Sequence, residues 1–319
     1  MTSDPLSDML THLNARSVMS GGLVAGGDWA IRFPQPNRIK ITSVARGACW
    51  LLREGHVPLR LDAGDVLLLN GTFSFVLATD PSLEPVDAKP IFRGRTGPIA
   101  YHGEGDDFFY IGGHVALDHN GMDLLLDVLP PIIHVRAGLA EAGTVRWLLD
   151  ELIHEMASER PGGQLAASQL AHLMFVQLLR AHIAASEPMA AGWLRAIGDE
   201  RIAPALRLMH ADPARDWQLG ELARAVGMSR TSFALRFKSI AGIAPLAYLA
   251  GWRMRLAERA LRDGNMPISS LALSLGYTSE SAFSNAFKRV TGVSPKRYRT
   301  VARAAGPAAE AEDETSAAA

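Results

Sequence analysis

The sequence predicts an α+β protein, in which an N-terminal antiparallel β-barrel with a helical extension precedes an all-α C-terminal domain. Three observations predict this class: short β-rich runs between residues 29 and 117, helical periodicity from residue 145 onward, and an internal repeat in the last third. At 319 residues the chain is too long for one core of ordinary size, because domains usually contain about 100 to 150 residues. We therefore expect several segments: a barrel domain at 1–135, a helical connector at 136–192, a helical domain at 193–303 and a disordered tail at 304–319.

The barrel is predicted from β-rich runs that are separated by turn residues. Their short, regular spacing is typical of a small antiparallel barrel. The runs are Trp29–Phe33, Arg38–Val44, Ala48–Arg53, Val57–Leu61, Val66–Leu69, Phe73–Leu77 and Phe108–Leu117.

The connector is predicted to contain two helices. Apolar residues recur at helical spacing between Val145 and Met156, and the segment Leu165–Leu179 is apolar on nearly every face. The barrel can cover one face of the second helix. A partner chain or the rest of the same chain must cover the other, so this segment is a candidate dimer interface. Residues 187–192 are expected to form a linker.

Composition and the chain start favour a cytoplasmic location. Hydrophobic residues make up 48% of the chain and charged residues 20%, which is typical of a soluble globular protein. The single cysteine, Cys49, excludes an internal disulfide and a cysteine-rich zinc site. No run of 18 apolar residues predicts a membrane span, and residues 1–8 lack the basic charge of a signal peptide.

The net charge of -1 hides a strong asymmetry. Between Arg195 and Arg303 there are 18 Lys and Arg against 8 Asp and Glu, a net charge of +10, whereas the rest of the chain carries 14 against 25, or -11. A basic domain is what binding to a polyanion requires. Charge alone fits two alternatives about equally well: a domain that binds a polyanion, and a domain whose charge only keeps it soluble.

An internal repeat decides between these alternatives. The two copies align with an offset of 49 residues that becomes 50 between a glycine and a phenylalanine, where a turn enters a second helix. The first copy contains Leu222, Ala223, Gly227, Phe233, Phe237, Lys238, Gly242, Pro245 and Tyr248, and the second contains Leu271, Ala272, Gly276, Phe283, Phe287, Lys288, Gly292, Pro295 and Tyr298.

Each copy is predicted to be a helix-turn-helix unit. Gly227 and Gly276 end the first helices, Ser229 and Ser279 can cap the second helices, and the second helix of such a unit enters the major groove of DNA. The segment 245–262 predicts a rigid helical spacer that could hold the two reading helices about 34 Å apart, which is one turn of B-DNA. A helical bundle without DNA function is the disfavoured alternative.

The segment Trp217–Arg299 resembles the DNA-binding domain of the AraC/XylS family, most clearly in LALSLGYTSESAFSNAFKRVTGVSPKRYR at Leu271–Arg299. The resemblance covers about a quarter of the chain and implies seven helices, two helix-turn-helix units and, usually, transcription activation with RNA polymerase as a partner. The run LRLDAGDVLLLNG at Leu59–Gly71 is similar to the strand, turn and strand of a cupin. This similarity implies a cupin-like sensor domain at 1–135.

The exposed faces of the two second helices contain the candidate DNA contacts. Arg and Lys suit phosphates, methyl groups suit thymine, and Asn suits the N6/N7 edge of adenine. Family members often carry a polar residue or Arg where Ala234 and Leu235 stand here, and Arg is common where Asn285 stands. We therefore expect the first helix mainly to position the domain and Asn285 to prefer adenine. The candidates are Arg230, Thr231, Ala234, Leu235, Lys238, Glu280, Ser281, Ser284, Asn285, Lys288 and Arg289.

These features predict a sequence-specific, double-stranded DNA-binding regulator, an activator that responds to a small-molecule effector and that can form a homodimer. We expect no catalytic residue, no metal, no cofactor and no membrane association, and the residues that bind the effector stay unassigned. The alternative is a cupin-type metal-dependent enzyme with a basic helical appendage. Against this alternative, the chain lacks a His-x-His motif, and His56, His102 and His114 are scattered singly. A third hypothesis is an architectural DNA binder without sequence preference.

Overall fold

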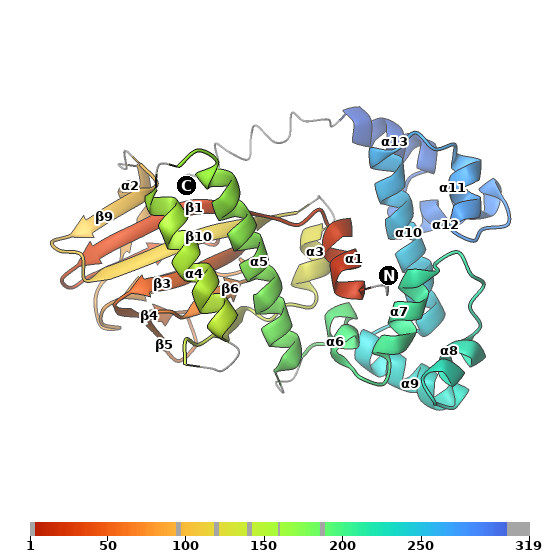
Figure 1. Ribbon diagram of the computed structural model, residues 1–319, viewed down its shortest axis with the longest axis horizontal. Helices are drawn as coiled ribbons and strands as arrows, with labels where there is room; N and C mark the ends of the chain where they lie inside the picture. The colour runs from red at the N-terminus through yellow and green to blue at the C-terminus, as the bar shows by residue number, and fades with distance from the viewer. Residues whose placement is uncertain are drawn as a thin grey trace. The chain divides into compact units, whose positions relative to one another are not determined.

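The computed structural model describes residues 4–93, 97–117, 121–138, 142–158, 160–185 and 189–304. The chain divides into a sheet unit, which begins at Asn14 and contains every strand of the described residues, and a helical unit that combines residues 4–13 with residues 189–304 (Figure 1). The predicted α+β class is confirmed. The expected tail lies outside the described residues from residue 305 on, as do residues 187 and 188 of the expected linker.

The strands form two sheets instead of one closed barrel. The larger sheet has the order β11-β6-β3-β10-β1-β9 and the smaller the order β5-β4-β7-β2-β8. Two pairs, β1 with β9 and β2 with β8, are parallel, which the antiparallel prediction missed. Both parallel partners are edge strands, so neither interrupts the antiparallel centre. The strands are β1 (Arg16–Gly26), β2 (Ala30–Phe33), β3 (Ile39–Arg46), β4 (Ala48–Leu52), β5 (Leu59–Asp62), β6 (Val66–Leu69), β7 (Phe75–Ala78), β8 (Val86–Asp87), β9 (Ile99–Gly103), β10 (Phe108–Ala116) and β11 (Ile132–Val135).

An apolar core fills the space between the two sheets. Alternate residues of each strand point inward, and they include Leu23, Ile31, Leu51 and Leu77. Strand β6 is buried at all four positions. It has no exposed face because α5 also packs against it from outside.

The described residues of the sheet unit form four helices: α2 (Ala88–Arg93), α3 (Gly121–Leu126), α4 (Ala142–Ala157) and α5 (Gly163–Ala184). Helices α4 and α5 pack on each other and on the larger sheet, with α5 against β1 and α4 against β3 (Figure 1). Both connector helices are therefore confirmed. Helix α5 buries Phe175 and Leu178 but leaves Leu165 and Leu173 exposed, so it retains an uncovered apolar stripe within the sheet unit.

Strand β1 was missed by the sequence prediction although it pairs on both sides in the larger sheet. Its residues include Gly21 and Gly22, and glycine normally weakens a strand. Here a Cβ at Gly22 would lie 2.9 Å from both the Phe109 side chain and the Tyr110 carbonyl oxygen. The glycine therefore permits a close approach between strands, which only the tertiary structure reveals.

The helical unit contains α1 (Pro5–His12), α6 (Trp193–Gly198), α7 (Ala203–Ala211), α8 (Leu219–Ala225), α9 (Arg230–Ala241), α10 (Pro245–Asp263), α11 (Ile268–Ser274), α12 (Glu280–Thr291) and α13 (Pro295–Ala304). The seven helices that the resemblance implied correspond to α7–α13. The short α6 precedes them, and α1 joins them from the other end of the chain.

Helix α1 departs from the expected division, which placed residues 1–135 in one domain. Asp4 caps it by accepting a hydrogen bond from the Leu6 amide at 3.1 Å. Its apolar face, with Met9 and Leu10 buried, packs on α6, α7 and α10 of the helical unit. Residues 4–13 therefore belong to the helical unit, because the partners of that face are there.

No single helix of the described residues is both long and apolar enough to cross a membrane. Only α9 and α10 taken together pass on length and composition, and they are bent by 52° at the break between them.

Candidate nucleic-acid interface

The first helix-turn-helix unit consists of α8, a short turn and α9. Gly227 has a φ of +66°, a left-handed conformation that favours glycine. The Ser229 hydroxyl accepts a hydrogen bond from the Ser232 amide at 3.2 Å and so caps α9, which ends at Gly242 with a φ of +78°. Phe233 and Phe237 are fully buried. The predicted unit and its core are confirmed.

The second unit, α11, turn and α12, repeats this geometry with one extra residue. Gly276 has a φ of +78°, and the Ser279 hydroxyl accepts a hydrogen bond from the Ala282 amide at 3.2 Å. The capping serine follows the turn glycine by two positions in the first unit and by three positions in the second. The change of offset from 49 to 50 therefore falls in the turn, as the repeat predicted.

Helix α10 and its residue Arg253 join the two helix-turn-helix units. The Arg253 guanidinium on α10 donates hydrogen bonds to the carbonyl oxygens of Pro213, at 2.6 Å, and Arg215, at 2.8 Å, in the loop before α8. The same guanidinium lies 5.8 Å from the ring centroid of Tyr277 in the second turn. Sequence reasoning missed this role, because the acceptors are backbone carbonyls about forty positions away and carry no sequence signal.

The second turn also makes a direct backbone contact with the loop before α8. A Cβ at Gly276 would lie 2.1 Å from the Ala214 carbonyl oxygen, so the second turn packs tightly on the loop that precedes the first unit. Together with Arg253, this contact fixes the orientation of one helix-turn-helix unit relative to the other.

On α9 the structure places four of the five candidate contacts at the surface. Arg230, Thr231, Leu235 and Lys238 are exposed, and Ala234 is half-buried. Leu235 is 67% exposed, which is unusual for a leucine on a helix whose other face is a packed core.

On α12 the candidates are likewise gathered on the outer face. Glu280, Ser281, Asn285, Lys288 and Arg289 are exposed, and Ser284 is half-buried. Glu280 is the first residue of the helix, where a negative charge stabilises the helix dipole. This placement gives Glu280 a structural role independent of any ligand.

The cations of the helical unit fall into two groups. Some are used within the protein: Arg236 donates to Asp199 at 2.6 Å, and Arg215 to Glu221 at 2.9 Å. By contrast, the side chains of four exposed cations on the outer faces of α9 and α12 make no hydrogen bond or ion pair with any described residue. These four are Arg230, Lys238, Lys288 and Arg289.

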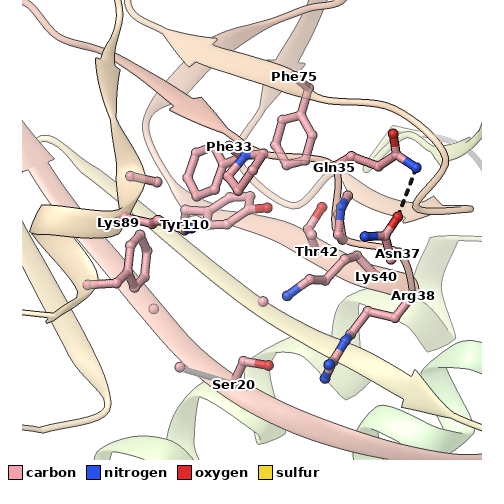
Figure 2. Close-up of a pocket in the computed structure, with 17 residues that line it drawn as sticks. Ser20, Phe33, Gln35, Asn37, Arg38, Lys40, Thr42, Phe75, Lys89 and Tyr110 are labelled. Carbon is pink, nitrogen blue, oxygen red and sulfur yellow. Dashed lines mark hydrogen bonds between the residues drawn. The ribbon is translucent and has the colours of Figure 1, made fainter. Parts of the chain in front are cut away.

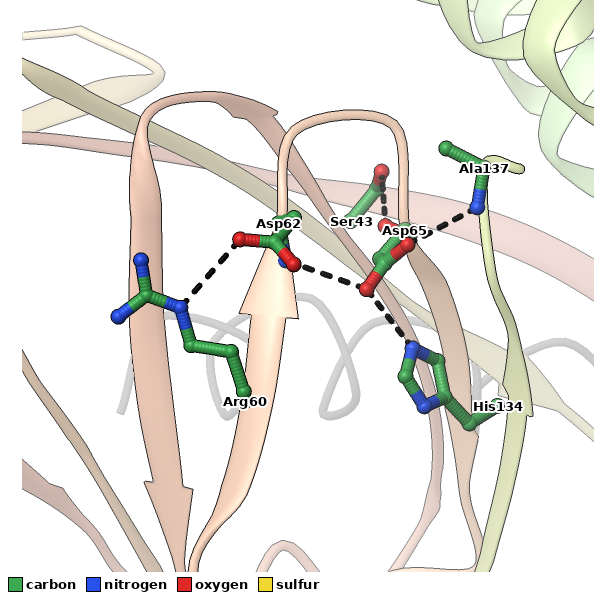
Figure 3. A network of polar contacts seen from close by, with 6 residues as sticks. All are labelled: Ser43, Arg60, Asp62, Asp65, His134 and Ala137. Carbon is green, nitrogen blue, oxygen red and sulfur yellow. Dashed lines mark hydrogen bonds and ion pairs between the residues drawn. The ribbon is translucent and has the colours of Figure 1, made fainter.

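The turn of the cupin-like run is fixed by a buried carboxylate (Figure 3). Asp65 accepts hydrogen bonds from His134 Nε2 at 2.9 Å and from the backbone amides of Ala137, at 2.9 Å, and Asp62, at 3.1 Å. Gly64, with a φ of +91°, makes the turn itself. The network ties the β5–β6 turn to β11, a tertiary role that sequence reasoning had not assigned.

Two of the histidines named in the sequence have different surroundings in the sheet unit. His56 is exposed beside Arg53, and His114 is buried between Ser20 Oγ, at 3.2 Å, and Arg38 Nη1, at 3.4 Å. Within the described part of the chain, no three His, Cys, Asp or Glu side chains gather where they could hold a metal ion.

The sheet unit contains a pocket with a cavity volume of about 320 Å³ (Figure 2). It lies between residues from β1, β2, the β2–β3 loop, β3, β7, α2 and β10. Sequence reasoning left the effector-binding residues unassigned, and it did not find this pocket, whose lining comes from five separate stretches of the chain, at residues 20–22, 33–42, 75, 88–92 and 110–112.

Two family models match the chain. A model described as cupin matches residues 4–184, and a model described as helix-turn-helix domain matches residues 222–300.

Full-length relatives cover nearly all of the chain. It is 44% identical to an AraC-like transcription regulator of Streptomyces lividans, over 93% of this chain and 98% of that one. It is 30% identical to the HTH-type transcriptional regulator AlkR of Acinetobacter baylyi, over 86% and 91%. Among solved structures, the DNA-binding domain of AdpA in complex with a target DNA is 30% identical, over 34% of this chain and 99% of that one, with a TM-score of 0.33. On its similarity to the Streptomyces lividans and Acinetobacter baylyi regulators, which runs through the cupin and the helix-turn-helix domains alike, the chain belongs to the AraC-like family of DNA-binding transcription regulators.

Proposed function

We propose that this regulator activates transcription at specific sites by placing α9 and α12 in successive major grooves, under the control of a small molecule bound by its N-terminal domain. One observation carries the proposal. Two helices on a rigid frame each present exposed cations that have no partner among the described residues. Such a surface is suited to a phosphate backbone, because each neutralised phosphate releases condensed counterions.

The candidate contacts divide by chemistry. Arg230, Lys238, Lys288 and Arg289 bind phosphates and set the register of the domain on DNA. Ser281, Ser284 and Asn285 on α12 read base edges, and Asn285 prefers adenine because its amide matches the N6/N7 edge.

Helix α9 reads DNA by apolar contact. The exposed Leu235, with Ala234 and the methyl group of Thr231, offers a surface that suits thymine methyl groups. Glu280 stands at the start of α12, where it also orients the helix end and disfavours misplaced phosphates.

Further partners follow from this role. An activator contacts RNA polymerase and works in the cytoplasm, where bacterial DNA lies. The exposed apolar residues Trp147, Leu165 and Leu173 on α4 and α5 are the proposed homodimer interface, because an uncovered apolar surface is typical of interaction sites. No catalytic step is proposed for the sheet unit.

The first experiment selects genomic DNA fragments with the purified chain near physiological salt and footprints the best one. We expect two protected patches about 34 Å apart on one face of the DNA. Asn285→Ala is expected to relax the preference at one base pair by about 1 to 3 kcal/mol. Lys288→Ala, its matched control one turn along α12, is expected to weaken all sequences alike and to reduce the salt dependence.

Two outcomes would contradict the proposal. Binding without sequence preference would instead indicate an architectural DNA binder. A tightly bound transition metal with turnover of a small substrate would revive the cupin enzyme, which bulk metal analysis of the same preparation detects.

A further inference from the structure

Lys40 lines the pocket of the sheet unit, at a position on the inner face of β3 where an apolar residue is expected. Side chains alternate along β3, so Lys40 shares the inner face with Thr42 and Val44, and Val44 belongs to the core between the sheets. Lys40 is half-buried, and its ammonium group makes no hydrogen bond or ion pair with the described residues. A desolvated cation without a counter-charge destabilises a fold, and residues of this kind concentrate at functional sites.

The charges around Lys40 all have the same sign. Arg38 and Lys89 also line the pocket, and none of the described lining residues is an Asp or Glu. Burial, together with the neighbouring Arg38 guanidinium, lowers the pKa of Lys40 to about 8, so the amine is still mostly protonated at neutral pH. The described lining is therefore positively charged, and it gives Lys40 no counter-charge.

The opposite side of the pocket is aromatic. The rings of Phe33 and Phe75 stack with their centroids 5.0 Å apart. The ring centroids of Phe92 and Tyr110 lie 6.0 and 6.3 Å from that of Phe33. Figure 2 shows the rings of Phe33, Phe75 and Tyr110 gathered on one side, with Lys40 and Arg38 reaching in from another. A volume of about 320 Å³ has space for about ten water-sized groups.

We propose that this pocket binds an organic anion with a compact apolar body, whose charged group is held by Lys40 and Arg38 and whose body lies against the Phe33 ring cluster. The assignment deepens the proposed function, on which its role as effector site rests. A charged oxygen supplies the counter-charge that Lys40 lacks, and a flat or short apolar body matches the aromatic wall. A neutral sugar would leave Lys40 without a counter-charge, and an inorganic anion would leave the aromatic side chains in contact with water.

The test uses calorimetric titration of the full chain with 2-naphthoate, compared with the neutral 2-naphthalenemethanol of similar size. We expect the anion to bind about 10- to 100-fold more tightly than the alcohol, since a charge-assisted hydrogen bond accounts for the difference. Lys40→Met, which keeps the approximate length of the side chain but removes the charge, is expected to reduce this preference about tenfold, with Arg38 still in place. The matched control Lys89→Met removes an exposed cation of the same pocket, and about twofold weakening is expected because water already screens that charge.

The outcomes separate this proposal from the proposed function. Equal affinities for the anion and the alcohol, unchanged anion binding by Lys40→Met, or no anion binding at about 1 mM would overturn it. Footprints of the wild-type and Lys40→Met proteins on the same DNA fragment, without anion, test DNA recognition independently. Failure there would contradict the regulatory role and leave the calorimetric result intact.

Discussion

At the scale of single residues, two equivalent glycines have different surroundings. Gly227 and Gly276 occupy the same place in the two turns, with φ values of +66° and +78°. Nothing lies within 4 Å of a Cβ built at Gly227, whereas one built at Gly276 meets the Ala214 carbonyl oxygen. The repeat makes them look interchangeable, and the packing makes them different.

The pair predicts different costs for the same substitution. Gly227→Ala adds only the strain of a left-handed alanine, about 1 kcal/mol. Gly276→Ala adds the same strain and also pushes the second turn off the Ala214 backbone, so we expect a loss of about 3 kcal/mol or more. Urea unfolding of both variants measures the difference.

The same pair affects DNA recognition. Because Gly276 helps to fix the orientation of one unit relative to the other, Gly276→Ala is expected to weaken a two-groove footprint more than Gly227→Ala does. Equal stabilities and equal footprints for the two variants would show that the contact with Ala214 does not hold the units together.

At the scale of elements, α1 is attached to the helical unit by histidines as well as by apolar contacts. With its proton on Nδ1, His210 on α7 donates to the Asp8 carboxylate of α1 at 3.0 Å and accepts from the Tyr248 hydroxyl at 2.8 Å. His12 on α1 packs edge-on against the Trp252 ring. Both imidazoles are buried, and burial favours the neutral form.

The docking of α1 is predicted to weaken in acid. Burial, and then the cations Arg255, Arg262 and Arg259 on α10, lower the pKa of His12 from its ordinary value of 6.5 to about 4. The unfolded chain takes up a proton below pH 6.5 that the folded protein resists, so stability falls as the pH drops from about 6.5 to 4. The full loss is about 3 kcal/mol for His12 alone.

Hydrogen exchange of residues 5–12, corrected for the intrinsic effect of pH, measures this dependence. The variant His12→Gln is expected to flatten the slope without removing it, since burial also lowers the pKa of His210. Protection of α1 that stays constant between pH 7.5 and 5 would contradict the prediction.

At the scale of the whole molecule, the helical unit is assembled from both ends of the chain. Residues 4–13 and 189–304 form one unit, and the sheet unit is inserted between them in sequence. Four apolar side chains of the first segment, Leu6, Met9, Leu10 and Leu13, are buried. Each contributes about 1.5 to 3 kcal/mol when it is fully buried.

The insertion predicts complementation in trans. A fragment of residues 189–319 is expected to be less stable than the same fragment mixed with a peptide of residues 1–14, and the peptide should raise its Tm by several degrees. The peptide Met9→Asp is the matched control, because a carboxylate cannot occupy the buried Met9 position. Equal Tm values with and without the peptide would show that α1 is dispensable to the helical unit.

Local patterns in the sequence determined the class of the fold, the two helix-turn-helix units with their capping serines and turn glycines, and the exposed faces of α9 and α12. These features depend on neighbours within about ten positions, so periodicity and capping chemistry reveal them. Which of the exposed residues contact DNA stays a prediction.

Only the tertiary structure decided the features that join distant segments. Strand β1 is hidden in the sequence because its glycines serve a contact with β10, and α1 was placed with the wrong unit because the partners of its apolar face lie about two hundred residues away. The hydrogen bonds of Arg253 are accepted by backbone carbonyls, and because every residue has such a carbonyl, the sequence does not reveal which ones serve as acceptors. In the sequence, Lys40 resembles any surface lysine. The structure places it in the lining of the pocket, on strand β3, which pairs with β10, because burial depends on packing across sheets and not on the local chain.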